Sequence, residues 1–395
     1  MNARILVLLE NNSYPGDVRV HREAASLANA GYQVTVICPG GGGQPWQEIV
    51  DGVAVYRFPT LPEASGFLGY LLEYGYATAA IFLLSLYAFL RPGFDIVHTH
   101  NPPDTLVFIA GFYKLFGKKF IYDHHDLSPE MYLALFGDKG KPFIHKTLLW
   151  LEKLSCRLAD HVIATNNSYK TIEMERNGVP EERITIVRNG PDLNRLREVA
   201  VDPALKQPGR ITLCYVGVMG RHDGVDYLLR ALKHLLEDFS RPDFLCLLVG
   251  GGDAWAELKL LAKELNLSDY VLFTGWVPCA KVARYLSAAD ICVAPEPSND
   301  YNDRSTMIKM TEYLALGKAT VAFDLPEHRV TAQDAALYAQ PNDELDLAQK
   351  IIELMDDPER RQYMGEIGKQ RIKTKLAWEH QEKHLLEVYK AINPF

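Results

Sequence analysis

The stretch RILVLLENNSYPGDVRVHREAASLANAGYQVTVIC, residues 4–38, predicts a strand, a helix and a second strand. Residues 4–9 and 33–38 are short apolar runs of strand length. Between them, Asp17 is placed to cap a helix that runs to Asn29 and ends before Gly31. A helix that connects two strands in this way favours a parallel pair with a right-handed crossover.

The same alternation continues along both halves of the chain. Further strands are expected at 53–58, 94–100, 119–126, 161–165 and 183–190, and then at 210–217, 243–250, 270–275, 289–295 and 319–324. Residues 191–209 break the pattern, because they carry three prolines and no sustained periodicity. The sequence therefore predicts an α/β fold of two Rossmann-like, doubly wound parallel-sheet lobes, residues 1–190 and 210–378, joined by the linker 191–209.

Composition excludes several protein classes. The chain has 395 residues, 48% of them hydrophobic and 23% charged, which is typical of a globular protein and not of a disordered one. A net charge of −8 argues against bulk nucleic-acid binding. The six cysteines form no CxxC pair, so they are interpreted as buried thiols of a reducing compartment. The N-terminal apolar run is too short for a signal peptide, and we expect a cytoplasmic protein.

One apolar segment is compatible with either a protein or a membrane environment. Residues 74–90, YGYATAAIFLLSLYAFL, are uncharged and as long as the shortest transmembrane helices. A helix buried in a large α/β domain is the favoured interpretation. The alternatives are a true span and a peripheral membrane contact through residues 67–90, where Tyr70, Tyr74, Tyr76 and Tyr87 are also found.

Polar side chains gather where the strands of the first lobe end, which is where parallel sheets bind ligands. HTHNPPD places His98, His100 and Asn101 after one strand, and YDHHDLSPE places His125 and Asp126 after the next. These residues suit substrate orientation, a structural hydrogen-bond network, or a metal site. His124 and His125 are not expected to share one ion, because neighbours on a strand point to opposite faces.

Two further motifs suit an anionic or polyhydroxyl ligand. Asp17 and Arg19 begin the first helix, where free amides favour anions, although a capped surface helix explains them equally well. In the second lobe, VGGGDAW follows a strand but lacks the GxGxxG spacing of a dinucleotide site. A helix expected near 306–316 carries Lys309 and Glu312 on one face, so its start suits a diphosphate and Glu312 suits a ribose diol.

Taken in order, these motifs resemble retaining glycosyltransferases of the GT-B fold, specifically glycosyltransferase family 4. The resemblance rests on D-x-R-V-x-x-E-A, HHDLSPE, RNGPDLN, YVGVMG, LVGGGD, FTGWVP and TEYLALGKATVAFD, spread over most of the chain. It implies a nucleotide-sugar donor in the second lobe, an acceptor in the first, and a C-terminal helix, residues 379–395, that packs back on the first lobe.

The resemblance also implies roles for single residues. His125 matches the histidine near the reacting sugar, and Glu312 matches the glutamate that binds ribose. The implied donor-binding residues are Gly217, Arg221, Gly250, Gly251, Trp276, Val277, Ser305, Thr306, Lys309 and Glu312. The implied acceptor-binding residues are Asp17, Arg19, His100, Asn101 and Asp126.

Three positions depart from the family pattern. Arg304 stands where the first glutamate of the E-x7-E motif is usual, and Asp303 or Glu296 are candidates to replace it. The diphosphate-binding Arg and Lys fall at Val218 and Asp223. The leaving diphosphate develops negative charge that needs a cation, and Arg221, Arg304 and Lys309 are the candidates.

The implied reaction moves a sugar from a UDP-, GDP- or other nucleoside-diphosphate sugar to a hydroxyl acceptor without a covalent enzyme intermediate. We expect no metal, and a lipid-linked acceptor of bacterial surface polysaccharide or glycolipid synthesis, at the inner face of the plasma membrane. The alternatives are a GT-B epimerase or phosphorylase, and a catalytically silent subunit that binds a nucleotide sugar.

Overall fold

The structure is a computed structural model that describes residues 3–41, 43–60, 66–193 and 195–392, without the side chains of 66–71, 138 and 279. Two compact units make up the chain. The first comprises the residues up to Arg188 together with those from Gln381 onward, and the second comprises Asn189–His380. Each unit has its own sheet and is described separately below.

The first unit is built on an eight-stranded sheet in the order β3-β4-β2-β1-β5-β6-β7-β8. The strands are β1 Arg4–Leu8, β2 Gln33–Gly40, β3 Gln47–Val50, β4 Val53–Pro59, β5 Ile96–His100, β6 Lys119–His124, β7 His161–Ala164 and β8 Ile184–Ile186. All neighbours pair in parallel except β3, an antiparallel edge strand that the sequence analysis missed. The strand order reverses between β1 and β5, which is where a doubly wound sheet presents its ligand site.

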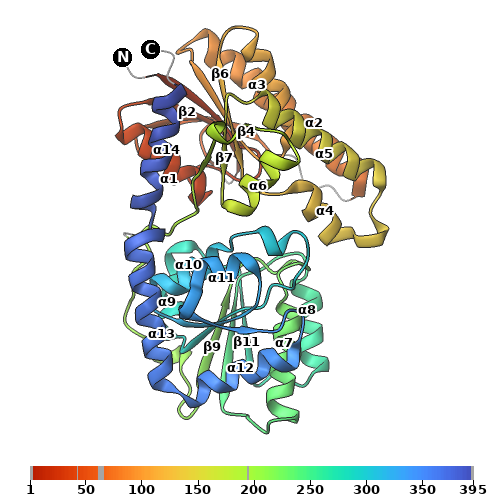
Figure 1. Ribbon diagram of the computed structural model, residues 1–395, viewed down its shortest axis with the longest axis vertical. Coiled ribbons are helices and arrows are strands. Elements are labelled where there is room, and N and C mark those ends of the chain that lie inside the picture. The colour runs from red at the N-terminus through yellow and green to blue at the C-terminus, as the bar shows by residue number, and fades with distance from the viewer. Residues whose placement is uncertain (1–2, 42, 61–65, 194, 393–395) are drawn as a thin grey trace. The chain divides into compact units, whose positions relative to one another are not determined.

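Helices cover both faces of this sheet (Figure 1). They are α1 Val18–Asn29, α2 Gly66–Leu90, α3 Val107–Lys114, α4 Ser128–Phe136, α5 Pro142–Leu158, α6 Asn167–Glu175 and α14 Trp378–Ile392, whose residues from Gln381 belong to this unit. The predicted cap of α1 is confirmed, because the Asp17 carboxylate accepts hydrogen bonds from the backbone N–H groups of Arg19 and Val20. Helix α14, although last in the sequence, lies beside α1 (Figure 1). The ring of Tyr389 in α14 is 5.6 Å from the ring of Tyr32, which follows α1.

Helix α2 is not the buried core helix that the sequence analysis favoured. A narrow stripe of Ala77, Ile81, Ser85 and Ala88 is buried, while Leu83 on the other side is 66% exposed. By length and composition, Leu72–Leu90 is the one helix among the described residues that is apolar enough to cross a membrane, and only 22% of its apolar window is buried. These residues follow one another at the i, i+4, i+8 and i+11 spacing of a single helix face, so one face of α2 is covered.

The second unit is built on a six-stranded, wholly parallel sheet in the order β11-β10-β9-β12-β13-β14. The strands are β9 Ile211–Val216, β10 Phe244–Val249, β11 Val271–Gly275, β12 Ile291–Ala294, β13 Ala319–Phe323 and β14 Ala336–Ala339. The helices are α7 Val225–Glu237, α8 Trp255–Glu264, α9 Cys279–Ala288, α10 Ile308–Ala315, α11 Pro326–Ala332, α12 Glu344–Asp356 and α13 Pro358–Arg371.

The core of the second unit explains its continuous apolar strands. Alternate residues of β10 enter two different clusters: Phe244, Cys246 and Leu248 pack with α7, α8 and α12, while Leu245 and Leu247 pack with α9 and α10. A parallel sheet covered by helices on both faces needs apolar residues at every strand position. The predicted fold class, two Rossmann-like parallel sheets, is therefore confirmed.

Candidate active site

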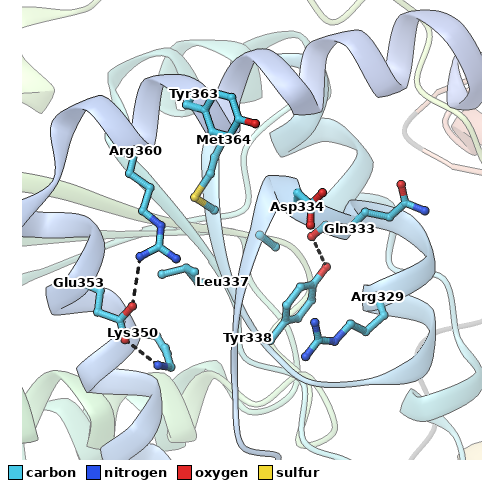
Figure 2. A pocket seen from close by; sticks show the side chains of 11 residues that line it. Arg329, Gln333, Asp334, Leu337, Tyr338, Lys350, Glu353, Arg360, Tyr363 and Met364 are labelled. Carbon is cyan, nitrogen blue, oxygen red and sulfur yellow. Dashed lines mark hydrogen bonds and ion pairs between the residues drawn. The ribbon is translucent and has the colours of Figure 1, made fainter.

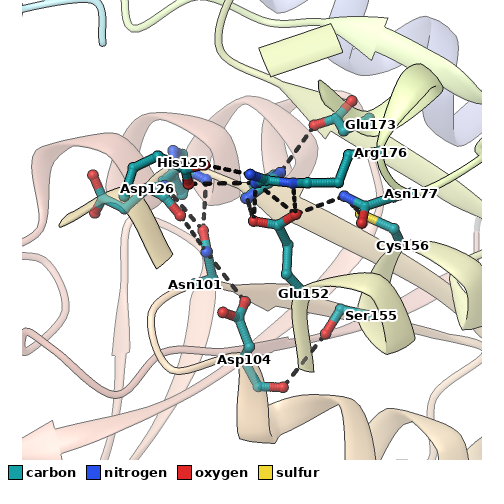
Figure 3. Close-up of polar contacts among 12 residues, drawn as sticks. Asn101, Asp104, His125, Asp126, Glu152, Ser155, Cys156, Glu173, Arg176 and Asn177 are labelled. Carbon is teal, nitrogen blue, oxygen red and sulfur yellow. Dashed lines mark hydrogen bonds and ion pairs between the residues drawn. The ribbon is translucent and has the colours of Figure 1, made fainter. Parts of the chain in front are cut away.

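The first group of predicted residues lies at the ends of β5 and β6. Asn101 holds the loop after β6, since its Oδ1 accepts hydrogen bonds from the backbone N–H groups of His125 at 2.6 Å and Asp126 at 3.1 Å. Its Nδ2 donates to the backbone carbonyl of Asp126 at 2.7 Å and to Asp104 (Figure 3). Predicted as an acceptor-binding residue, Asn101 uses its side chain to position the backbone of this loop.

The two adjacent histidines point to opposite faces of the sheet, as predicted. The His125 Nε2 atom is 2.9 Å from His100 Nδ1 and 3.3 Å from Asp123 Oδ2. The His100 and His125 rings are stacked, 11° from parallel. Within the described part of the chain, His125 Nδ1 has no hydrogen-bond partner. One ring nitrogen is thus held by the protein, and the other is free to bond a ligand.

On the opposite face, His124 belongs to a buried ionic network. Its Nδ1 atom is 3.2 Å from Glu173 Oε1. In the same network, Arg176 Nη2 forms an ion pair with Glu152 Oε2 at 2.7 Å (Figure 3). Burial alone would lower the pKa of His124, but the hydrogen bond to Glu173 and the charge of Glu152 outweigh it and raise the pKa to about 9. His124 is therefore a charged structural residue at neutral pH.

Asp17 and Arg19 satisfy each other. Arg19 Nη2 is 3.0 Å from Asp17 Oδ2, and Asp17 also caps α1. Burial raises the pKa of Asp17, but the Arg19 charge outweighs this effect and holds it well below its ordinary value. The pair thus forms a capped, ion-paired helix start, and its role in binding the acceptor stays a prediction.

In the second unit, the glycine-rich loop serves backbone packing more than ligand approach. A Cβ at Gly250 would lie 1.9 Å from the Gly217 carbonyl oxygen, and one at Gly252 would lie 2.8 Å from Met219. The loop after β10 therefore packs directly on the loop after β9. Gly251 differs, because a Cβ there would meet only the Trp276 backbone nitrogen, at 3.6 Å, so the space beside it stays open for a ligand.

Lys309 reaches the loop after β9 from α10. Its Nζ is 3.0 Å from the Tyr215 hydroxyl and 3.4 Å from Asp223 Oδ1, and it pairs with Glu296. Burial lowers the pKa of Lys309, but these carboxylates outweigh burial and raise it well above the ordinary value. The charge of Lys309 is already neutralised, so Lys309 is not the free diphosphate cation that the sequence analysis considered. The negative charge of Asp223 would be unfavourable in a loop that binds an anion. Its pairing with the Lys309 ammonium compensates that charge.

Most of the other predicted donor residues are more exposed than Lys309, although Ser305 is buried. Helix α10 begins at Ile308, so Ser305 and Thr306 precede it and do not form its first turn as expected. Thr306 Oγ1 donates to Glu327, and Arg221 pairs with Glu257 at 3.0 Å on the surface. Glu312 and Val277 are partly buried, and Trp276 is 79% exposed. Among these residues, Arg221 is the most accessible cation. Its exposed ion pair with Glu257 contributes only about 0–1 kcal/mol, so the guanidinium separates easily from Glu257 to bind a ligand.

Two pockets lie away from these loops. The larger, about 450 Å³, is lined in the second unit by α11, β14, α12 and α13 and contains no predicted site residue (Figure 2). The smaller, about 280 Å³, lies in the first unit between the ends of β1, β2 and β4 and helix α2. It holds Glu10 and Glu73 beside Phe58, Tyr74 and Tyr76. The sequence analysis missed Glu10, although it directly follows the first strand.

Glu10 makes the stability of the first unit sensitive to pH. Burial, with a contribution from the charge of Glu73, raises the pKa of Glu10 to about 7. Because this pKa is above that of the unfolded chain, the stability contributed by protonated Glu10 is lost as pH rises from about 4.5 through 7. We expect the Tm of Glu10→Gln to exceed that of the parent protein by a margin that grows between pH 5 and pH 8. The exposed substitution Glu387→Gln is the control, and a margin independent of pH would contradict the prediction.

Comparisons with known proteins agree with this architecture. A family model described as Glycosyltransferase Family 4 matches residues 16–195, and one described as Glycosyl transferases group 1 matches residues 197–371. A glycosyltransferase of Methanocaldococcus jannaschii is 26% identical over 306 residues, which cover 76% of each chain. The UDP-Gal:alpha-D-GlcNAc-diphosphoundecaprenol alpha-1,3-galactosyltransferase of Escherichia coli is 24% identical over 285 residues, 69% of this chain and 68% of that one. Sucrose-phosphate synthase from Thermosynechococcus elongatus has the same fold, with a TM-score of 0.83 at 21% identity over 99% of both chains.

Proposed function

Because the chain belongs to the group 1 glycosyltransferases of family 4, which have the GT-B fold, we propose that it transfers a sugar from a nucleoside-diphosphate sugar to a hydroxyl group with retention of anomeric configuration. The observation that carries this proposal is the arrangement of His125. Its Nε2 is held by His100 and Asp123, while Nδ1 has no partner among the described residues. A histidine oriented in this way can hydrogen-bond a hydroxyl group of the reacting sugar and hold the sugar in position for transfer.

We assign the donor to the second unit. Gly251 and the exposed Trp276 offer an open backbone and a ring for the base, and the half-buried Glu312 offers a carboxylate for the ribose diol. The leaving phosphate takes the proton of the acceptor hydroxyl, so the protein supplies positioning and electrostatics and no nucleophile. Arg221 and Arg304 provide the positive charge, and we propose that no metal is needed at the diphosphate.

The acceptor is assigned to the first unit, where Glu10, Glu73 and the tyrosines of the smaller pocket combine carboxylates with aromatic rings. That combination suits a saccharide, since hydroxyl groups bond carboxylates and the apolar faces of sugars pack on rings. We propose that this saccharide is lipid-linked and belongs to bacterial surface polysaccharide or glycolipid synthesis. Support comes from the name of the Escherichia coli relative, which specifies a diphosphoundecaprenol acceptor.

An exposed apolar surface of the first unit supports a membrane-bound substrate. This membrane-facing surface consists of Leu83 of α2, Leu115 and Phe116 after α3, and Phe108 and Trp150, whose rings are 6.1 Å apart. Leu83 is 66% exposed and Leu115 is 82% exposed. The ring of Phe116 is 5.7 Å from Phe89 of α2, so the surface is continuous from α2 to α3.

Basic side chains border this surface. Lys118 lies 5.7 Å from the Phe89 ring, and Arg91 lies 5.7 Å from the Tyr87 ring. An apolar face with cations at its edge suits an anionic bilayer, because leucine and aromatic side chains enter the headgroup region while lysine and arginine bind lipid phosphates. We propose that the protein acts in the cytoplasm as a peripheral protein on the inner face of the plasma membrane.

The membrane proposal predicts a loss of vesicle binding when the surface is charged. Fully burying a leucine side chain contributes about 1.5–3 kcal/mol, so Leu83→Glu should weaken binding to anionic vesicles by about tenfold or more. Cosedimentation with phosphatidylglycerol vesicles at low salt measures this change. Leu260→Glu, at an exposed leucine of α8 in the second unit, is the matched control. If the parent protein ignores the vesicles, or if both variants lose binding equally, the proposal is wrong.

A second candidate function follows from the neutralised Lys309. Lys309, the buried cation considered for the donor diphosphate, is already paired with Glu296 and Asp223. This pairing fits a catalytically silent subunit that binds a nucleotide without turnover. A thermal-shift panel with UDP, GDP, ADP and TDP, each with and without Mg²⁺, followed by a turnover assay, separates the two functions. A ligand at 100 times its Kd adds about 2.7 kcal/mol. Each kcal/mol raises Tm by roughly 2–4 °C in a domain of this size.

For the transferase we expect one nucleotide to raise Tm by about 5–10 °C without Mg²⁺, together with turnover of the matching sugar nucleotide. A shift without turnover on any acceptor supports the silent subunit. The absence of any shift contradicts both functions, and a shift that requires Mg²⁺ contradicts the metal-independent mechanism.

A further inference from the structure

Four ligand-type side chains converge inside the first unit, from three different elements. Glu23 comes from α1, His98 and His100 from β5, and Asp123 from β6, and all four are buried. One ligand atom from each lies within 4.8 Å of the others. The two histidines are two residues apart on one strand, so both point to the face that α1 covers.

The atoms that face the centre of this cluster lack hydrogen bonds. Among the described residues, none is made by Nε2 of His98, Nε2 of His100, Oε2 of Glu23 or either carboxylate oxygen of Asp123. Two carboxylates buried side by side repel each other, and the imidazole nitrogens 3.3–3.4 Å from Asp123 Oδ2 offset only part of this cost. A divalent cation removes this cost, since its charge equals that of Glu23 and Asp123 together while the imidazoles bind as neutral ligands.

The Nδ1 atoms of His98 and His100, in contrast, have hydrogen-bond partners. His98 Nδ1 is 2.6 Å from the Tyr389 hydroxyl, and His100 Nδ1 is 2.9 Å from His125 Nε2. Nδ1 of His100 also lies 3.4 Å from Asp123 Oδ2. His98 uses Nδ1 for a protein partner and turns Nε2 toward Asp123. A metal-bound histidine has this arrangement, because the partner of the outer N–H sets both the tautomer and the ring orientation.

The spacing also suits a tetrahedral ion. His98 Nε2 is 3.3 Å from Asp123 Oδ2, and His100 Nε2 is 3.9 Å from Glu23 Oε2. With metal–ligand bonds of about 2.0–2.2 Å, neighbouring ligands of a tetrahedral zinc ion are about 3.3–3.6 Å apart. One of these pairs is at tetrahedral spacing, and the cluster, whose ligand atoms lie within 4.8 Å of one another, contracts to bind an ion. Two imidazoles with two carboxylates are a donor set that zinc accepts.

We propose that Glu23, His98, His100 and Asp123 bind one structural Zn²⁺ ion in the first unit. Four protein ligands leave no open position, so this ion stabilises the unit and does not activate water. With Nε2 bound to zinc, the Nδ1–H of His100 donates to His125 Nε2, which leaves the proton of His125 on Nδ1. The site is separate from the donor diphosphate, and its test does not depend on glycosyltransferase activity.

The test measures metal directly on the full chain. The protein is purified without a metal-affinity step, stripped with a chelator, and titrated with Zn²⁺ against a chromophoric competitor, then with Co²⁺ to record visible absorption. We expect one equivalent of zinc, a higher Tm in the zinc form, and the intense Co²⁺ bands typical of tetrahedral coordination. If the folded parent chain retains no zinc and shows no such bands, the proposal is overturned, and the cluster is a metal-free network that shares protons.

Variants separate ligation from folding. Asp123→Asn and His98→Gln should lose stoichiometric zinc, whereas His161→Gln, at a buried histidine of β7 that contacts Thr185, should keep it. Tyr389→Phe keeps all four ligands and removes only the partner of His98 Nδ1, so it should weaken zinc affinity by about 10–100-fold. Unchanged affinity in Tyr389→Phe and Asp123→Asn, with both variants folded by circular dichroism, would also overturn the proposal.

Discussion

Replacing His125 with alanine is expected to lower kcat by at least about two orders of magnitude, the usual effect of removing one preorganised electrostatic donor. The polar side chains beside His125 that the structure describes already have partners of their own. His100 Nδ1 and Asp123 Oδ2 lie 2.9 and 3.3 Å from Nε2 of His125, and His124 points to the other face and pairs with Glu173. The variant should keep its nucleotide affinity, because the residues assigned to the donor nucleotide belong to the second unit.

Steady-state turnover and nucleotide thermal shifts, measured together, check this prediction. His384→Ala, at an exposed histidine of α14, is the control and should leave kcat unchanged. His125→Asn, which keeps a hydrogen-bond donor, should recover part of the lost rate. Turnover near the parent value in His125→Ala would remove His125 from the catalytic residues and end the proposed mechanism.

Replacing Lys309 with methionine should cause the largest loss of stability. Glu296 is fully buried and Asp223 nearly so, and both contact the Lys309 ammonium. Breaking a buried pair by removing one partner costs about 3–5 kcal/mol, because the remaining charge is left uncompensated. At roughly 2–4 °C per kcal/mol, the Tm should fall by at least about 6 °C.

A double variant identifies the cause. Lys309→Met combined with Glu296→Gln removes one of the two stranded carboxylates, so it should be more stable than Lys309→Met alone. Lys233→Met, which breaks only the surface pair with Glu237, is the control and should change stability by less than about 1 kcal/mol. Equal stability of Lys309→Met and the control would show that the cluster contributes no stability.

Local sequence patterns determined the fold class, the cap of α1 and the positions of the strands other than β3 and β14, which were not predicted. Apolar runs of strand length that alternate with helical periodicity restrict the chain to parallel, doubly wound sheets, and a side chain such as Asp17 caps its own helix whatever the rest of the chain does. The start of α10 was less accurate. The chain before Ile308 makes a short 3-10 turn at Asn302–Arg304 and then extended backbone, while the polar residues there look like a helix start.

Local sequence patterns could not predict contacts between residues that are far apart in the sequence. Lys309 was predicted to bind the donor, but its Asp223 partner lies 86 residues away in the sequence and, together with Glu296, neutralises its charge. The favoured burial of α2 was wrong for a related reason, since an apolar helix is buried only where other elements cover it, and here they cover one stripe.

By itself, then, the sequence determined two parallel-sheet lobes and the family motifs at their strand ends, because these depend on residues close in the chain. Only the tertiary structure decided what each polar side chain bonds. Tyr389 reaches His98 across 291 positions, and Glu23 meets Asp123 from a different element. Such pairings follow from how strands and helices are ordered in space, which no local pattern of residues encodes.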